Sequence, residues 1–223
     1  VSGGQFKVPL VERPTPGAGR QLAAQHSHRL EGWFAHVPGL KVVAPATPED
    51  ARWMLPTALA DPNPVIIFEH ATLYNDRGPV DPALGPVDLE RAAVRRLGSD
   101  ATVIASAGMV PKALAAADAL TALGVSAEVV DLRSLRPLDF DTLASSLAHT
   151  NRALVVDEGW RTGGLSAEIA ATLTERCFWS LDAPVARLAS AEVPIPYAKH
   201  LEFAAIPQVD GIVAAVLELV GGR

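Results

Sequence analysis

The sequence lacks a second cysteine, an excess of positive charge and a long apolar run. Cys177 is the only cysteine, so no disulfide can form within the chain, and this fits a small core residue in a reducing compartment. Lysine and arginine number 19 against 25 aspartate and glutamate residues, a net charge of -6, which argues against nucleic-acid binding. No apolar run approaches the roughly 20 residues that span a bilayer. We therefore expect a cytoplasmic protein that binds neither nucleic acid nor membrane.

Two further absences concern the start of the chain and nucleotide binding. The sequence opens at Val1 without a methionine or a secretory signal, and residues 2–5 read as a loop already in progress, so we expect a fragment of a longer protein. Residues 158–164 (Glu-Gly-Trp-Arg-Thr-Gly-Gly) lie between an expected strand and an expected helix, a position that can bind anions. They lack the glycine spacing of a dinucleotide or P-loop fingerprint, which disfavours a nucleotide-binding regulator.

The first third of the chain mixes helical and extended patterns. Ser27 is a candidate N-cap for a helix over residues 30–37, which the following Pro-Gly pair ends. Thr47 is a candidate cap for a second helix, with Pro48 at its first position and acidic residues in its first turn. Strands are expected at residues 7–13, 40–44 and 65–68.

Beyond residue 92, extended and helical patterns alternate regularly. Strands are expected at residues 102–107, 127–132, 153–157 and 185–188. Helices are expected at residues 111–123, 141–148, 165–178 and 209–220. Such alternation implies right-handed crossovers and a parallel sheet. Residues 71–92, rich in proline, glycine and charge, predict a linker that lies against a surface.

His26 is the sharpest candidate for chemistry. It lies in the polar segment Gln25-His26-Ser27, just before an expected helix that runs into a strand, where α/β enzymes present catalytic groups. An imidazole titrates near neutral pH, so it can shuttle a proton or stabilise developing negative charge. From spacing alone, a histidine that caps the helix or is satisfied in the loop is the better interpretation. For His28, helix capping is likewise favoured over a perturbation of His26.

The segment Ala58-Leu59-Ala60-Asp61-Pro62-Asn63-Pro64 predicts a helix C-terminus followed by a proline-fixed turn. The last carbonyl groups of a helix have no intrahelical partner and need one. A hard monovalent cation is one answer, while water or a cap is the commoner one. The sequence alone leaves both open.

Three motifs match the pattern of a known family. They are Gln25-His26-Ser27 followed by residues 38–43 (Pro-Gly-Leu-Lys-Val-Val), residues 131–139 (Asp-Leu-Arg-Ser-Leu-Arg-Pro-Leu-Asp) and residues 193–199 (Val-Pro-Ile-Pro-Tyr-Ala-Lys). Over essentially the whole chain the sequence resembles the β subunit of the decarboxylating component of 2-oxo acid dehydrogenase complexes. These subunits form a thiamine-diphosphate-dependent branch of the transketolase family.

The resemblance implies an α/β fold with two domains. Residues 1–75 would be the C-terminal half of the thiamine pyrimidine-binding α/β domain, and residues 76–92 a linker. Residues 93–223 would form a transketolase-type C-terminal domain with a mainly parallel sheet.

The resemblance also implies site residues. His26 would face the thiamine cofactor and the incoming acyl acceptor as the catalytic residue. The position that follows Ser27 is usually glutamine in relatives and is His28 here. A structural potassium ion would be held, mostly through backbone oxygens, by Leu10, Ala58, Leu59, Asp61 and Asn63.

Other matching segments are expected to be architectural. The loop at residues 158–164 resembles a glutamate-to-double-glycine loop of the family that shapes the fold. Arg133 is expected to form a structural ion pair with Asp131 or Asp139 rather than to bind a ligand. Pro194 and Pro196 are expected to fix an extended segment.

Two parts of the family's cofactor site are expected outside this sequence. The glutamate that activates the thiamine aminopyrimidine ring is expected upstream of residue 1. The Gly-Asp-Gly motif that holds magnesium and diphosphate belongs to the α subunit, and it does not occur here. The chain is therefore expected to carry no cofactor-binding residue of its own and to be inactive in isolation.

The implied activity is oxidative decarboxylation of a 2-oxo acid, with pyruvate as the first expectation, and acyl transfer to lipoyl groups. Branched-chain 2-oxo acids and acetoin are the other substrates of such enzymes. The implied partners are an α subunit in an α₂β₂ assembly with β–β contacts, and the lipoyl acyltransferase component. The alternatives are a non-catalytic assembly or docking module of the complex, and another thiamine enzyme of the family such as a transketolase or a xylulose-phosphate synthase.

Overall fold

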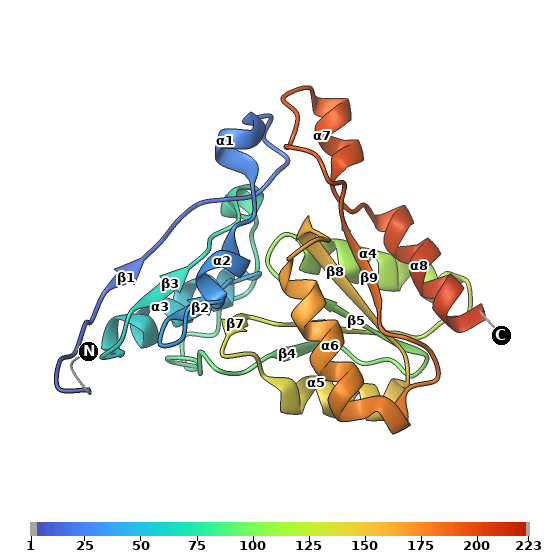
Figure 1. Ribbon diagram of the computed structural model, residues 1–223, viewed down its shortest axis with the longest axis horizontal. Coiled ribbons are helices and arrows are strands. Elements are labelled where there is room, and N and C mark those ends of the chain that lie inside the picture. The colour runs from blue at the N-terminus through green and yellow to red at the C-terminus, as the bar shows by residue number, and fades with distance from the viewer. Residues whose placement is uncertain (1–3, 222–223) are drawn as a thin grey trace.

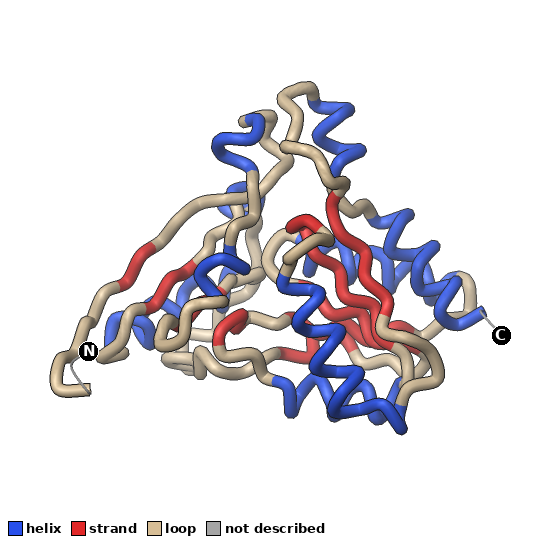
Figure 2. The backbone as a smooth tube through the Cα atoms, in the orientation of Figure 1, coloured by secondary structure: helices blue, strands red, loops and turns tan. Residues whose placement is uncertain are grey.

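A computed structural model describes residues 4–221, which form two β-sheets with helices packed on them (Figures 1 and 2). This arrangement confirms the α/β class expected from the sequence. Residues 2 and 3 of the loop expected at residues 2–5 lie outside the described residues, and Gly4 and Gln5 belong to no helix or strand.

The first sheet has four short strands. In spatial order they are β1 (Val11–Glu12), β3 (Val65–Ile67), β2 (Lys41–Val43) and β7 (Ser134–Arg136). The first three run parallel, while β7 pairs antiparallel with β2. The strand expected over residues 7–13 is reduced to β1, because Pro9 and Pro14 lack the backbone N–H that a ladder needs. Since β7 comes from the second half of the sequence, the two halves of the chain share this sheet.

The second sheet confirms the expected parallel core. Its strands, in spatial order, are β4 (Ala93–Arg96), β6 (Ala127–Asp131), β5 (Ala101–Ala105), β8 (Ala153–Trp160) and β9 (Ala186–Ser190). The last four run parallel to one another, as their alternation with helices predicted. The edge strand β4 is antiparallel and was not predicted.

Helices cover both faces of the second sheet. One face packs against α4 (Met109–Ala122) and α8 (Val209–Gly221), and the other against α5 (Phe140–Thr150) and α6 (Leu165–Cys177). The core on the α5–α6 side continues into the first sheet, where it includes Val42 and Ile66. Cys177 belongs to this core and is 9% exposed, as expected for a small structural residue.

The helices of the first half are α1 (Ala23–Ser27), α2 (Glu31–Ala35) and α3 (Pro48–Ala60), followed by the 3₁₀ turn η1 (Ala71–Asn75). Thr47 caps α3 as predicted, because its hydroxyl accepts a hydrogen bond from the Asp50 N–H at 3.1 Å. The cap predicted at Ser27 is wrong. Ser27 is the last residue of α1, its side chain is buried, and His28 then adopts an extended conformation that separates α1 from α2.

One stretch of the described chain, Lys199–Gly221, has the length and mean hydropathy (1.7) of a membrane-crossing helix. In the fold it is two helices, α7 (Lys199–Ala205) and α8, joined by a short non-helical segment. Ile212 and Val216 of α8 are fully buried against α4 and the second sheet. The buried face of α8 therefore belongs to the protein core.

Candidate active site

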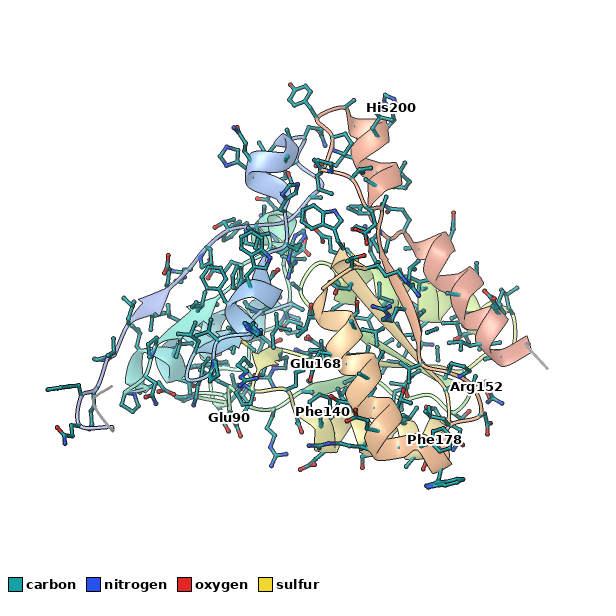
Figure 3. The ribbon with its side chains drawn as sticks, viewed as in Figure 1. Glu90, Phe140, Arg152, Glu168, Phe178 and His200 are labelled. Carbon is teal, nitrogen blue, oxygen red and sulfur yellow. The ribbon has the colours of Figure 1, made fainter. Side chains whose placement is uncertain are left out.

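His26 lies in the last turn of α1 and is exposed. The sequence placed it in a loop, but the structure places it on a short helix at one end of the molecule. There α1 stands opposite α7, on which His200 is labelled (Figures 1 and 3). The imidazole of His26 is therefore accessible from solvent in this chain.

A tightly bent loop, residues 17–21, leads into α1. Gly17 and Gly19 have φ values of +115° and +107°. A Cβ at Gly17 would lie 2.5 Å from the Nε2 atom of His70, so only glycine fits there. Two buried carboxylates hold the loop: Glu158 accepts the Ala18 N–H at 2.7 Å, and Glu202 accepts the Gly19 N–H at 2.8 Å.

His70 and Glu158 form a buried pair behind this loop. The Nε2 of His70 lies 2.8 Å from a Glu158 carboxylate oxygen, and the two side chains are only 3% and 2% exposed. The other ring nitrogen, Nδ1, accepts the Thr72 N–H at 3.3 Å, so Nε2 carries the hydrogen that is donated to Glu158. Burial alone raises the pKa of Glu158, but His70, Arg29 and the Ala18 N–H outweigh it and lower this pKa to about 2.

Glu158 should therefore stabilise the fold in a pH-dependent way. Because its folded pKa lies below the ordinary value, its contribution is complete above about pH 4.5 and is lost as the pH falls toward about 2. At about 1.4 kcal/mol per unit, the lost stability approaches about 3 kcal/mol. We expect Glu158→Gln to flatten the pH dependence of the unfolding free energy over this window, measured by denaturant titration. An exposed control, Glu218→Gln, should retain the wild-type slope.

His28 connects α1 to the second half of the chain. Its Nε2 accepts a hydrogen bond from the Ile195 N–H at 3.2 Å. Its ring packs edge-on against the Trp160 ring, with 4.6 Å between the ring centroids. The helix-capping role expected for the His28 side chain is therefore wrong. Burial lowers the pKa of His28, which favours the neutral ring that this acceptor role requires.

The segment that follows His28 contains a buried ion pair between Arg29 and Glu31. Their side chains are 5% and 6% exposed. They line a pocket together with Trp33, Trp160 and the Gly163–Gly164 turn. A Cβ at Gly164 would lie 2.1 Å from the Trp160 carbonyl oxygen, so this turn is shaped by close backbone packing. These contacts fit the architectural role expected for residues 158–164.

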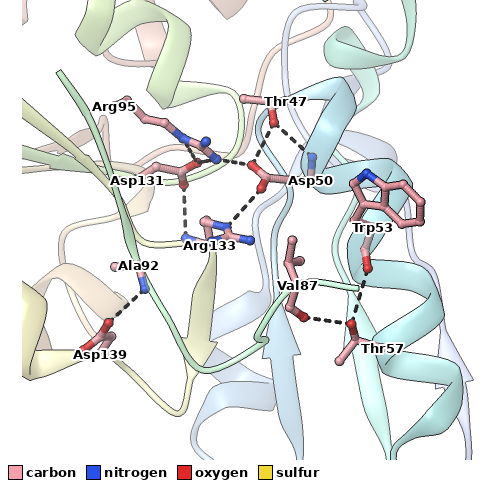
Figure 4. Close-up of polar contacts among 10 residues, drawn as sticks. All are labelled: Thr47, Asp50, Trp53, Thr57, Val87, Ala92, Arg95, Asp131, Arg133 and Asp139. Atoms are coloured by element: carbon pink, nitrogen blue, oxygen red, sulfur yellow. Dashed lines mark hydrogen bonds and ion pairs between the residues drawn. The ribbon is translucent and has the colours of Figure 1, made fainter. Parts of the chain in front are cut away.

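Arg133 forms the structural ion pair that was expected, but with a different partner. Its Nε lies 3.0 Å from Asp50, whereas only its backbone N–H reaches Asp131, at 3.1 Å (Figure 4). Arg95 pairs with both Asp50 and Asp131. Asp139 instead caps α5 through its hydrogen bond from the Thr142 N–H. The expectation that Arg133 pairs with Asp131 or Asp139 is wrong for its side chain.

Of the residues expected to hold potassium, Ala58, Leu59, Asp61 and Asn63 lie at or just after the C-terminal end of α3, and Leu10 lies next to β3. The Leu10 carbonyl accepts the Val65 N–H at 2.8 Å, the Ala58 carbonyl accepts the Asp61 N–H at 3.2 Å, and the Asp61 side chain accepts the Asn63 N–H at 2.8 Å. Lys41 lies 2.7 Å from the Asp61 carboxylate, and together with Asn63 it lowers the pKa of Asp61 despite the opposing effect of burial. The Leu10 and Ala58 carbonyls and the Asp61 carboxylate thus already have partners within the chain, and the potassium site stays a prediction.

Two family models match the chain. The model described as "Transketolase, pyrimidine binding domain" covers residues 1–77, and the one described as "Transketolase, C-terminal domain" covers residues 90–212. The chain belongs to the transketolase family. The resemblance seen in the Gln25-His26-Ser27 segment and in the motifs at residues 131–139 and 193–199 is thereby confirmed.

Relatives within this family include pyruvate dehydrogenase β subunits. The chain is 45% identical over 219 residues to "Pyruvate dehydrogenase E1 component subunit beta-2, mitochondrial" of Oryza sativa subsp. japonica, covering 96% of this chain and 58% of the relative. It is 42% identical over 228 residues to "Pyruvate dehydrogenase E1 component subunit beta, mitochondrial" of Drosophila melanogaster, covering 100% of this chain and 62% of the relative. The chain thus spans about three fifths of the length of these relatives.

A solved structure shares the fold. The chain described as "Split gene transketolase, inactive beta4 tetramer" superposes with a TM-score of 0.80 at 26% identity. The match covers 96% of this chain and 67% of that one. The pairing of two transketolase-type domains expected from the sequence therefore matches a known three-dimensional arrangement.

The sequence did not reveal His70 or Glu202 as site residues. It also gave no sign that Glu158 is a buried carboxylate paired with His70. They lie far apart along the chain: 88 residues separate His70 from Glu158, and 183 separate Gly19 from Glu202. The one available signal was the pair of glycines in Pro-Gly-Ala-Gly at residues 16–19, which marks a bent loop before α1.

Proposed function

We propose that this chain is part of the β subunit of a pyruvate dehydrogenase-type enzyme, which oxidatively decarboxylates pyruvate and transfers the acyl group to lipoyl groups. The supporting observation is 45% identity to a pyruvate dehydrogenase β subunit over 96% of the chain. The proposal divides the chain at the boundaries expected from the sequence: residues 1–75, the linker 76–92, and residues 93–223.

His26 is the residue that would act in this reaction. It is exposed at the end of α1, and buried carboxylates fix the loop before that helix. Opening the lipoyl disulfide leaves a sulfur that needs a proton, and a neutral-range imidazole can supply one from a ring nitrogen. His26 would therefore serve as the general acid at the acyl-acceptor step.

Thiamine diphosphate, when bound, would supply the carbanion chemistry of the decarboxylation. Following the family resemblance, the proposal gives magnesium and the diphosphate to an α subunit, and the activating glutamate to a segment upstream of residue 1. This chain's own part is to present His26 and to shape its surroundings.

The proposed partners are an α subunit in an α₂β₂ assembly with β–β contacts, and a lipoyl acyltransferase. Support for an assembly comes from relatives that are named as β subunits of an E1 component. The cytoplasmic location stays a prediction, and the two relatives described above are named as mitochondrial.

The proposal is tested by comparing the isolated chain with the complete β subunit assembled with its α subunit. We expect the assembly to release carbon dioxide from pyruvate and to acylate lipoyl domains. The isolated chain should do neither, and isothermal titration should show no tight binding of thiamine diphosphate with magnesium. A complete assembly that lacks activity with pyruvate, branched-chain 2-oxo acids and acetoin would contradict the proposal. Binding and turnover by the isolated chain would contradict its division of the cofactor site.

Potassium at the end of α3 is a second, separable part of the proposal. The donor set is Leu10, Ala58, Leu59, Asp61 and Asn63. Because a bound ion stabilises the folded state by RT ln(1 + [L]/Kd), the complete β subunit should melt at a higher temperature in potassium chloride than in sodium chloride. Choline chloride at the same ionic strength gives the baseline without a competing metal ion. Identical melting curves in all three salts would remove the potassium site.

A further inference from the structure

The loop that leads to His26 is anchored by a carboxylate from the other end of the chain. Glu202, on α7, accepts the Gly19 N–H at 2.8 Å and the Gln21 N–H at 3.1 Å. It also accepts a hydrogen bond from the Gln21 side-chain amide, Nε2, at 3.0 Å. Three N–H groups from one short loop thus converge on a single side chain.

This loop needs an anchor because its backbone is strained. Gln21 in the loop and Ala23, the first residue of α1, have φ values of +53° and +58°, in the left-handed region that residues with a side chain rarely adopt. Such conformations persist only where the surrounding structure holds them. Hydrogen bonds to an ionised carboxylate are stronger than those between neutral groups. Glu202 therefore supplies a contact that can hold the loop bent where α1 begins.

The burial pattern of α7 points to the same role. Glu202 is 1% exposed, whereas its neighbours Leu201 and Phe203 are 50% and 61% exposed. The polar contact of Glu202 therefore helps to orient α7, together with Ala205, which is buried against Ala18 and Ile195. The Ala205 carbonyl accepts the Ala191 N–H at 2.8 Å, which ties the end of α7 to the residue that follows β9. The second sheet thereby sets the position of Glu202.

We propose that Glu202 is a positioning residue that holds α1, and with it His26, in the orientation used for acyl transfer. The inference rests on the proposed function, because it assigns His26 to that step. Glu202 itself lies behind the loop and acts only through it. A displacement of about 1 Å in a catalytic group can cost about 100-fold in rate.

The test uses Glu202→Gln in the complete αβ enzyme. The substitution keeps the side-chain shape, but it replaces one acceptor oxygen with a donor that faces the donors of the loop. We expect the kcat for lipoyl acylation to fall about 10- to 100-fold. Decarboxylation measured with an artificial electron acceptor should change by less than about twofold, since this assay bypasses the acyl acceptor. Glu218→Gln, an equal loss of charge at an exposed position on α8, should match the wild type in both assays.

A second variant separates positioning from general damage. Gln21→Glu places a carboxylate against Glu202 and should impair acylation alone, whereas the double variant Gln21→Glu/Glu202→Gln restores one donor–acceptor pair and should recover part of the rate. Hydrogen exchange of the peptide over residues 19–27 should rise in each single variant and fall again in the double. Should Glu202→Gln fail to fold, Gln21→Glu and the double variant still give the comparison.

Two results would overturn the proposal. One is wild-type exchange at residues 19–27 in both single variants, and the other is faster exchange without a loss of acylation. The exchange measurement does not depend on activity, so failure of the proposed function is distinguishable. If His26→Ala left acylation intact, the assignment of His26 would fail, whereas a role for Glu202 as anchor of the loop would be judged by exchange alone.

Discussion

His26→Ala in the complete αβ enzyme is expected to reduce the rate of lipoyl acylation by about 10² to 10⁴, the usual contribution of a general acid or base. The imidazole is exposed at the end of α1, so its removal leaves no cavity in the core. The free energy of unfolding should therefore change by less than about 0.5 kcal/mol. Single-turnover acylation of an isolated lipoyl domain, followed by mass spectrometry, measures the effect on the step itself.

The matched control is His149→Ala, which removes an exposed histidine from the last turn of α5. Its acylation rate should equal that of the wild type. Decarboxylation with an artificial electron acceptor should fall much less than acylation in the His26 variant. Equal losses in both assays would move His26 to an earlier step, and wild-type acylation would remove it from the mechanism.

Local signals accounted for much of the fold. The Thr47-Pro48 start of α3, the apolar run of β3 and the four parallel strands of the second sheet follow from capping, hydrophobicity and alternation. In each case the residues that determine the element lie within or next to it. Such signals did not single out a catalytic group near α1, because spacing alone favoured a structural role for His26, and only the family resemblance favoured catalysis.

The predictions that failed depend on contacts between distant residues. Ser27 does not cap a helix because His28, one residue on, is bound to the N–H of Ile195, and this contact holds the chain extended between α1 and α2. The short strand β7 forms only because it can pair with β2. A three-residue segment carries too little pattern of its own to be recognised as a strand.

Buried charges were the hardest feature to foresee. Glu202 stands between exposed residues on α7, so its sequence neighbours give no indication that it is 1% exposed. His70 and Glu158 pack together from opposite halves of the chain. A charged side chain is usually solvated, and only the three-dimensional structure shows that these side chains are buried.

Arg95→Ala is expected to destabilise the fold more than His26→Ala or Glu158→Gln. Arg95 binds Asp131, whose side chain is fully buried, and also Asp50, which is 4% exposed (Figure 4). Burial already raises the pKa of Asp131 to about 6 although Arg95 opposes this shift. Without the guanidinium, Asp131 would keep only the N–H of Arg133 as a hydrogen-bond donor among these residues. Removing one partner of a buried ion pair costs about 3 to 5 kcal/mol.

The neighbouring residue on β4 provides the control for this prediction. Arg96 pairs with Asp118, whose side chain is 74% exposed, so Arg96→Ala should cost less than about 1 kcal/mol. The double variant Arg95→Ala/Asp131→Asn should recover part of the loss, because no unpaired buried charge remains at position 131. Urea unfolding of the three variants at neutral pH measures these differences. If Arg95→Ala cost no more stability than Arg96→Ala, the network of Asp50, Arg95, Asp131 and Arg133 would contribute little to the fold. The packing of α3 against the second sheet would then depend on apolar contacts alone.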